Sequence, residues 1–374
     1  MSIKKRLKKA TRIVVKIGSS TLTHATAKLD LGQIESLIRQ LVDLKNQDKE
    51  LIVVTSGAIS AGRGKLNLEE APQTIPQKQA LAAVGQGLLM QIYEKIFSEY
   101  GKTIAQVLLT RRDVTDRKRY LNSRNTLLQL LDYGIIPVIN ENDTVAVDEI
   151  KFGDNDTLSA LVASLVDAEL LIILSDVEGI YTGDPRSDDS AELITEISEI
   201  TAEIEELAGG AGSSRGTGGM VTKVEAAKVS TKAGIITMIA NGSQEGVLRK
   251  IVQGENPGTV FIPAAERLAQ RKKWIAFNLS VTGELVVDAG AATAILERGT
   301  SLLPCGIVEV EGDFKAGDVV DIINPQSELI GRGIVNYSAA ELENIKGLQS
   351  QEIESELGYK DYDEAIHRDN LVCL

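Results

Sequence analysis

Cysteine and histidine are nearly absent from this chain. Its 374 residues include two cysteines, Cys305 and Cys373, and two histidines, His24 and His367. Two distant cysteines without a CxxC pair provide neither a disulfide framework nor a thiolate metal site, and they suit a reducing compartment. The lack of histidine near the acidic clusters of the chain argues against a metal centre there.

Long hydrophobic runs and an excess of positive charge are also missing. No apolar stretch has the length that spans a membrane, and the basic segment 1–12 is not followed by the apolar core of a signal peptide. There are 40 lysines and arginines against 53 aspartates and glutamates, and the formal net charge is −13. This charge disfavours binding to nucleic-acid phosphates. We expect a cytoplasmic protein that binds neither membranes nor nucleic acid.

The chain does have the length and the apolar content for two domains. It is 43% hydrophobic, and predicted strands alternate with predicted helices up to residue 262. The strands are residues 11–17, 51–54, 103–109, 135–139 and 170–174, and the helices are residues 31–45, 78–97, 121–131 and 157–166. Strands this uniformly apolar are buried on both faces, which indicates a parallel sheet covered by helices. We therefore expect an α/β fold, a three-layer αβα sandwich with a mainly parallel central sheet.

From about Trp274 the pattern changes. Short β-rich segments separated by turn residues predict a small C-terminal β-barrel, with strands near residues 284–287, 306–310 and 319–323. A polar stretch rich in charge separates this region from the first. We expect a first domain at residues 1–262, a linker at 263–274, a second domain at 275–355 and an unassigned tail at 356–374.

A glycine-rich loop is the most informative segment. Residues 209–219 include six glycines, and residues 220–233 have the apolar spacing of a helix. A glycine loop leading into a helix N-terminus presents free backbone N–H groups and the positive end of the helix dipole, which suits a phosphate. Lys223 falls in the first turn of this helix and adds a full positive charge. The alternative is a flexible glycine linker.

Four polar turns follow predicted strands, at residues 18–20, 55–57, 140–143 and 175–176. In a parallel sheet, ligands bind outside the carboxyl ends of the strands. Lys16 ends the first strand, and its ammonium suits a bound anion because burying it unpaired is costly. Gly18 lets the backbone approach the same anion closely. The alternative for Lys16 is a side chain that extends into solvent.

The turn after the second strand has the spacing of a P-loop but not its residues. Four residues separate Gly57 from Gly62, yet Arg63 and Gly64 stand where a P-loop has lysine and then serine or threonine. A P-loop is therefore excluded. Ser56 either binds a substrate carboxylate or only caps the following helix.

Two clusters rich in acidic and amide side chains occupy residues 140–143 and 153–156. Asparagine and aspartate together can recognise the ammonium and carboxylate of an amino acid, and an aspartate can also hold two lysines in position. Ordinary Asx turns explain the same composition. A metal site is a third alternative, although the spacing is not that of an EF-hand loop.

As a set, these motifs resemble those of the glutamate 5-kinases, a group within the amino-acid kinase family. The matching segments are residues 16–20, 54–59, 137–143, 152–160, 184–186, 216–223 and 295–304. The predicted barrel is similar to the PUA domain of many bacterial members. The departures are conservative, since Ser175 stands where many members have threonine and residues 17–19 read Ile-Gly-Ser in place of Leu-Gly-Thr.

The resemblance implies a role for each matching position. Lys16 and Lys223 would contact the phosphoryl group in transfer, and Asp156 would orient both lysines. The implied substrate-binding residues are Ser56, Asp143 and Asn155. The implied ATP-binding residues are Lys16, Gly18, Ser175, Asp176, Thr217, Gly218, Gly219, Met220, Val221, Thr222 and Lys223.

The implied reaction moves a phosphoryl group from ATP to the side-chain carboxylate of L-glutamate, giving L-glutamyl 5-phosphate in the first step of proline biosynthesis. This carboxylate, with a pKa of about 4.3, needs no general base near neutral pH. Mg²⁺ would arrive with ATP, without a metal site on the protein. The resemblance further implies feedback inhibition by proline and a homo-oligomer, either a dimer or a tetramer.

Two alternatives stay open. One is a sister kinase acting on acetylglutamate, aspartate or uridylate, although these enzymes lack the barrel. The other is RNA binding through the barrel, because PUA domains resemble modules of RNA-modifying enzymes. Residues 275–355 carry four basic residues against thirteen acidic ones, and a surface of this sign repels a polyanion.

Overall fold

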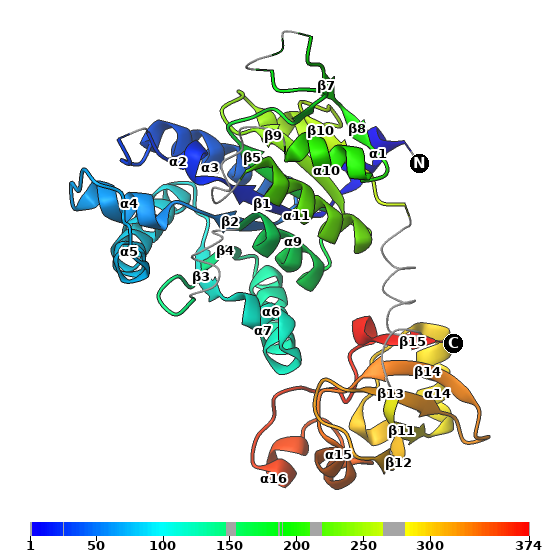
Figure 1. The fold of residues 1–374 in the computed structure, drawn as a ribbon. Helices are drawn as coiled ribbons and strands as arrows, with labels where there is room; N and C mark the ends of the chain where they lie inside the picture. Colours follow the sequence, from blue (N-terminus) through cyan, green and yellow to red (C-terminus); the bar gives the residue numbers. More distant parts are fainter. Residues whose placement is uncertain are drawn as a thin grey trace. The chain divides into compact units, whose positions relative to one another are not determined.

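The computed structural model describes residues 2–24, 26–146, 155–185, 188, 190–209, 219–264 and 281–373. The chain divides into two compact units, Met1–Glu266 and Arg267–Leu374 (Figure 1). No helix among the described residues is long and apolar enough to cross a membrane.

An eight-stranded sheet forms the centre of the first unit. Its strand order is β3-β4-β2-β1-β5-β9-β10-β8, and every neighbouring pair is parallel except β9 and β10. The strands are β1 (Arg12–Ile17), β2 (Glu50–Thr55), β3 (Ile104–Leu109), β4 (Ile136–Glu141), β5 (Leu170–Ser175), β8 (Glu196–Ile197), β9 (Ile236–Asn241) and β10 (Thr259–Phe261). Strands β1, β2 and β5 are buried along almost their whole length, which confirms the prediction of a mainly parallel, covered sheet.

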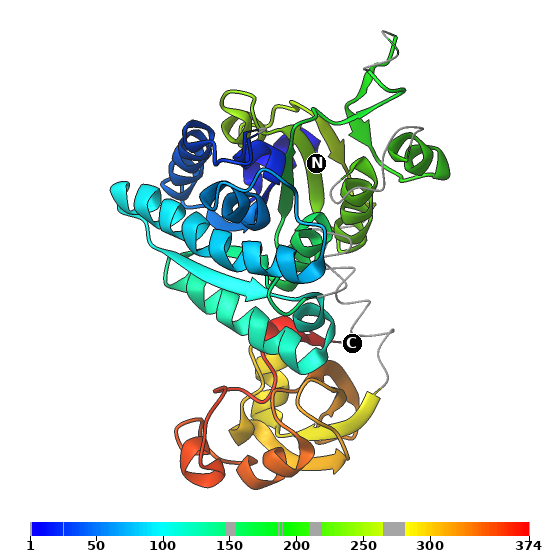
Figure 2. The ribbon, with the colours of Figure 1, turned by 60° about the vertical axis from the view of Figure 1, so that its left-hand side comes forward.

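Helices cover both faces of this sheet (Figures 1 and 2). On one face lie α1 (Ile3–Lys9), α3 (Leu31–Lys45), α5 (Ile75–Glu99) and α12 (Val247–Val252). On the other lie α6 (Arg111–Thr115), α7 (Arg117–Asp132), α9 (Asn155–Leu165), α10 (Ala202–Ala208) and α11 (Met220–Lys232). Shorter elements are α2 (Ser19–Leu22), α4 (Ala58–Lys65), β6 (Ile180–Tyr181) and β7 (Leu193–Ile194). The predicted three-layer αβα arrangement is confirmed.

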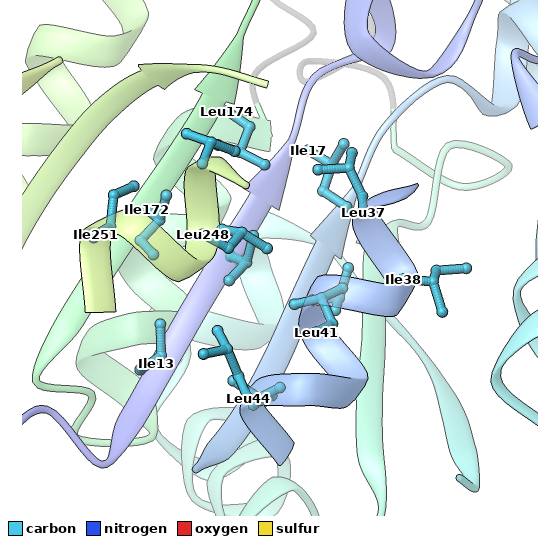
Figure 3. Close-up of a cluster of buried hydrophobic side chains, with 14 of the residues drawn as sticks. Ile13, Ile17, Leu37, Ile38, Leu41, Leu44, Ile172, Leu174, Leu248 and Ile251 are labelled. Carbon is cyan, nitrogen blue, oxygen red and sulfur yellow. The ribbon is translucent and has the colours of Figure 1, made fainter. Parts of the chain in front are cut away.

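Strand β1 contributes to both cores. Ile13 and Ile17 pack with side chains of α3, β5 and α12 in one cluster, which Figure 3 shows. Val14 belongs to the cluster on the opposite face, with side chains of α9 and α11. Successive side chains of a strand point to opposite faces, so Lys16 shares the face of Val14 and is directed toward α9 and α11.

Capping side chains determine where two helices begin. Thr74 and Gln77 form a reciprocal capping box at the start of α5, which begins at residue 75 where the apolar pattern predicts residue 78. Asp116 accepts a hydrogen bond from the backbone N–H of Arg119, and α7 begins at residue 117 where the pattern predicts residue 121. Periodicity detects only the part of a helix that faces the core, so it misses these capped first turns.

Helices α4 and α5 pack with their backbones in contact. A Cβ atom at Gly62 would lie 1.9 Å from the carbonyl oxygen of Leu81, and one at Gly85 would lie 1.8 Å from that of Ala58. Neither distance is possible for a real side chain, so only glycine allows this approach. The contact holds the N-terminal end of α4, and the preceding turn at Gly57 with a φ of 92°, against α5.

The second unit is built on a five-stranded sheet of order β12-β11-β13-β14-β15. Its strands are β11 (Val281–Val287), β12 (Ile307–Gly312), β13 (Val319–Ile323), β14 (Leu329–Ile334) and β15 (Leu371–Cys373). Its helices are α14 (Ala289–Arg298), α15 (Ala339–Ile345) and α16 (Ile353–Leu357). Side chains of strands and helices form one core of its own, including Leu285, Ile295 and Leu342. A small, mostly β second domain is thus present.

The end of the chain differs from the expectation. The sequence pattern leaves residues 356–374 unassigned, whereas in the structure β15 pairs antiparallel with β14. Ala365 and Ile366 are fully buried in the core of the second unit. The segment is polar overall, and its few apolar residues find their place only through long-range strand pairing, which local periodicity does not reveal.

The glycine contact between α4 and α5 predicts the effect of two alanine substitutions in the same helix. Gly85→Ala should lower the free energy of unfolding by about 1–3 kcal/mol, because the methyl group forces the helices apart. Gly87→Ala is the matched control, since a Cβ there meets nothing within 4 Å. It should leave stability unchanged or raise it by up to about 1 kcal/mol. Urea denaturation measures both, and equal effects would contradict the backbone contact.

Candidate functional site

A cavity of about 550 Å³ lies at the carboxyl ends of β1, β2, β4 and β5. These strands, the turns after them and the first turns of α9 and α11 supply residues to its lining, namely Lys16, Gly18, Ser56, Asn140, Asp143, Asn155, Ser175, Asp176 and Lys223. The three polar turns after β1, β2 and β4 therefore open onto one cavity together with the residues at the end of β5. This is the edge of the sheet at which a parallel α/β fold binds its ligands.

A buried ionic triad forms one wall of the cavity. The Lys16 ammonium lies 2.5 Å from Asp156 Oδ1, and the Lys223 ammonium lies 3.1 Å from Asp156 Oδ2. The exposed fractions are 5% for Lys16, 0% for Asp156 and 3% for Lys223. Two cations share one anion, so the triad carries a net positive charge next to the cavity.

Three separate elements position the triad. Lys16 extends from β1, while Asp156 and Lys223 lie in the first turns of α9 and α11. The Thr222 hydroxyl donates to Asp156 Oδ2 at 2.7 Å, and the Ser159 hydroxyl donates to the Asp156 backbone carbonyl at 2.6 Å. The Thr222 bond restricts how the carboxylate can turn between its two lysines, and the Ser159 bond holds the backbone of the same residue.

The charge state of Asp156 follows from these neighbours. Burial alone would raise the pKa of this carboxyl, but the charges of Lys16 and Lys223, with hydrogen bonds from Lys16 and Thr222, outweigh it. The pKa of Asp156 is therefore lowered below its usual value. An aspartate held in this way stays ionised and is unsuited to act as a general base.

The turns at the ends of β1 and β5 lie close together. The Gly18 N–H donates to the carbonyl of Leu174 at 3.1 Å, and a Cβ at Gly18 would lie 3.2 Å from that same oxygen. The Ser175 hydroxyl donates to Asp176 Oδ1 at 3.0 Å. Ser175 is buried, while Asp176 is exposed.

Part of the expected phosphate loop lies outside the described residues, including Thr217 and Gly218. Gly219 is the N-cap residue of α11 and provides no side-chain cap. Gly219, Met220, Val221 and Thr222 are not among the residues lining the cavity. Of these four, Thr222 still reaches the site through its bond to Asp156.

Amide side chains connect Ser56 to the rest of the site. The side-chain NH₂ of Asn155 donates to the Thr55 carbonyl at 2.8 Å, to Ser56 Oγ at 3.0 Å and to Asn140 Oδ1 at 2.9 Å. Asn140 in turn donates to Gln86 Oε1 at 2.7 Å. Asn155 therefore contacts Ser56 directly, while its neighbour Asp156 contacts the two lysines.

Asp143 lies on the same cavity but in a different environment. It is half-buried, and burial raises its pKa to about 6. It forms no ion pair with a described residue. A carboxylate in this situation gains from a cationic ligand, because the ligand would compensate for the loss of water.

Two polar residues of α5 near this site have no signal in the sequence. Lys78, in the first turn, lines the cavity and has no ion pair with a described carboxylate. Gln86, two turns further on, bonds to Asn140. No local signal marks either residue, because the backbone contact of α5 with α4 brings them to the site.

Metal ligation has little support within the described ranges. No group of three or more histidine, cysteine, aspartate or glutamate side chains there could hold a metal ion. The ammonium groups of Lys16 and Lys223 lie beside the cavity, and they suit an anionic ligand.

Comparison with known proteins gives consistent matches along the chain. Residues 11–241 match the Amino acid kinase family, and residues 283–357 match the PUA domain. A glutamate 5-kinase of Caldanaerobacter subterraneus is 58% identical over 97% of this chain and 98% of its own length. One of Moorella thermoacetica is 55% identical over 98% of this chain and 97% of its own length. One of Geobacter sp. is 52% identical over 99% of this chain and its own full length.

Among solved structures, the UMP kinase of Bacillus anthracis covers 68% of this chain and 97% of its own length. The TM-score is 0.48 and the sequence identity 14%, a similarity too weak to bear on function.

The triad predicts a large stability loss in one variant. Asp156→Asn would leave two buried ammonium groups facing each other, and we expect the free energy of unfolding to fall by about 3–5 kcal/mol at neutral pH. The pKa of Asp156 is lowered in the folded state, so its stabilisation is present above pH of about 4 and is lost as the pH falls further.

Urea denaturation from neutral pH downward should therefore show the difference between the variant and the wild type shrinking in acid. Asp176→Asn is the matched control, because that carboxylate is exposed. Equal stability of Asp156→Asn and wild type would contradict the triad.

Proposed function

This chain belongs to the amino acid kinase family, within its glutamate 5-kinase group, and we propose that it phosphorylates the side-chain carboxylate of L-glutamate with ATP. The products would be ADP and L-glutamyl 5-phosphate, in the first step of proline biosynthesis. Identities of 52–58% to three glutamate 5-kinases, over nearly full lengths, support this substrate.

The single observation that carries the proposal is the triad of Lys16, Asp156 and Lys223. Its net positive charge lies beside a cavity large enough for a small substrate and is pre-positioned by an ionised aspartate. A phosphoryl group in transfer spreads negative charge over its equatorial oxygens. Two fixed ammonium groups stabilise that charge more strongly than water does, because they need no reorganisation.

The nucleophile explains why the cavity needs no general base. The side-chain carboxyl of glutamate has a pKa of about 4.3 and is ionised near neutral pH. Asp156 is committed to its lysines, and the described lining of the cavity contains no histidine. Catalysis then consists of bringing two anions together in line and neutralising their repulsion.

On the nucleotide side, the proposed contacts are Gly18, Ser175, Asp176 and residues 217–223. The fit of a nucleotide is supported by the start of α11, whose first backbone N–H groups receive no side-chain cap and so remain for phosphate oxygens. Gly18 keeps the backbone open next to Lys16. Mg²⁺ would enter bound to ATP and would supply charge neutralisation on the phosphates.

On the amino-acid side, the proposed contacts are Ser56, Asp143 and Asn155. The half-buried Asp143 carboxylate suits the α-ammonium of glutamate, which N-acetylglutamate lacks. Lys78, which lines the same cavity and has no ion pair with a described carboxylate, suits the α-carboxylate. Proline carries the same two groups, which supports its binding here as a feedback inhibitor. That inhibition and a homo-oligomeric state stay predictions.

An ATP-dependent hydroxamate assay tests reaction and substrate together. With L-glutamate, L-aspartate and N-acetyl-L-glutamate offered in parallel, we expect product from L-glutamate and at least about 10²-fold less from the other two. The free α-ammonium and the side-chain length both select for glutamate. A preference for N-acetyl-L-glutamate or L-aspartate would overturn the proposal in favour of a sister kinase.

The raised pKa of Asp143 predicts a pH dependence. Only the ionised carboxylate pairs with the ammonium of glutamate, so kcat/KM for glutamate should fall about tenfold per pH unit below pH of about 6. Asp143→Asn should raise the KM for glutamate strongly, leave the KM for ATP nearly unchanged and remove this inflection. Steady-state kinetics from pH 5 to 8 measure all three. An unchanged KM for glutamate together with a raised KM for ATP would place Asp143 on the nucleotide side.

A further inference from the structure

A chain of four hydrogen-bonded side chains runs from α5 to the substrate cavity. Gln86 Oε1 accepts from Asn140, Asn140 Oδ1 accepts from Asn155, and Asn155 also donates to Ser56 Oγ. The distances are 2.7, 2.9 and 3.0 Å. Asn140, Asn155 and Ser56 line the cavity, whereas Gln86 does not. Gln86 is thus the outer end of this chain.

Backbone groups determine which way each amide points. The backbone N–H of Glu141 donates to Asn140 Oδ1 at 2.9 Å, so this atom must be the oxygen. The Thr55 carbonyl accepts from Asn155 at 2.8 Å, so the atom facing it must be the nitrogen. With both orientations set, Gln86 must present its oxygen to the NH₂ group of Asn140.

This polarity decides what the cavity offers a ligand. The two hydrogens of the Asn155 NH₂ group are shared among three protein acceptors, while its Oδ1 accepts no hydrogen bond from any described residue. Ser56 Oγ accepts from Asn155, and its own proton has no acceptor among the described residues. Asn155 Oδ1 can therefore accept a hydrogen bond from a ligand, and the Ser56 hydroxyl can donate one.

We propose that Gln86 is a positioning residue for the amino-acid substrate. Acting through Asn140, it reinforces the orientation in which Asn155 Oδ1 accepts from the α-ammonium and the Ser56 hydroxyl donates to a carboxylate. This inference rests on the proposed function and extends it to a residue that does not touch the cavity.

The hydrogen bonds of Gln86 allow its role in positioning Asn140 to be distinguished from its contribution to the stability of the fold. Among the described residues, its Oε1 is the only acceptor for the NH₂ group of Asn140, and its own Nε2 is buried without a hydrogen-bond partner. An apolar side chain of similar size would remove this unpaired donor but would leave the buried NH₂ group of Asn140 without its acceptor, so the two effects on the free energy of unfolding partly offset each other. Without Oε1, however, Asn140 is held only through its Oδ1, by the Glu141 N–H and Asn155, so both amide side chains are less firmly positioned.

The test compares Gln86→Met with Gln86→Glu, which keeps an oxygen facing Asn140. Gln86→Met should raise the KM for L-glutamate by about tenfold, with kcat and the KM for ATP nearly unchanged. It should also reduce the preference for L-glutamate over glutarate, which lacks the ammonium group. This preference is measured as the ratio of the KM for L-glutamate to the inhibition constant of glutarate. Gln86→Glu should restore both quantities toward wild type.

Gln91→Met is the matched control, because Gln91 is exposed on the same helix. If Gln86→Met fails to fold, Gln86→Leu and Gln86→Glu carry the same comparison. An unchanged glutamate KM and selectivity in a folded Gln86 variant would overturn the inference. Equal losses in kcat and in both KM values would also overturn it, because they indicate a merely structural role. Wild-type protein inactive on L-glutamate would instead overturn the proposed function.

Discussion

The pairing of Asp156 with Lys16 and Lys223 is the interaction on which the rest of the site depends. Two ammonium groups would repel each other at this depth, and a buried unpaired charge would shift its pKa or remain exposed. The ionised carboxylate between them lets both stay charged and buried. A buried triad with one excess positive charge contributes little to the stability of the fold. Its arrangement makes sense as preparation for an anionic ligand.

Helix α9 divides the site into two parts through two consecutive residues. Asp156 is directed to the lysines, while Asn155 is directed to Ser56 and the end of β2. Neighbouring residues of a helix point about 100° apart, so one helical turn can serve both ends of a cavity. The charged end suits the phosphoryl group, and the amide end suits the zwitterionic part of an amino acid. A small displacement of this first turn would therefore disturb both the pairing of Asp156 with the lysines and the contact of Asn155 with Ser56.

Much of the fold was predictable because its signals are local. The apolar runs of β1, β2 and β5 predicted a covered parallel sheet, and the side-chain periodicity predicted helix α3 at its observed bounds. The helix starts at Thr74 and Asp116 were placed too late, because capping depends on polar side chains outside the apolar pattern. Strand β15 was missed altogether, since three residues form a strand only when β14 is beside them.

By itself the sequence determined the alternation of strands and helices and the polar turns at the strand ends, because periodicity and chain direction are properties of short segments. It also identified Lys16, Asp156 and Lys223 as one set through their motifs. Tertiary structure alone decided that Gln86 and Lys78 belong near the cavity and which way each amide points. Those choices depend on partners far away along the chain, 54 residues for Asn140 with Gln86 and 100 for Asn155 with Thr55, and on a backbone contact that only Gly62 and Gly85 allow.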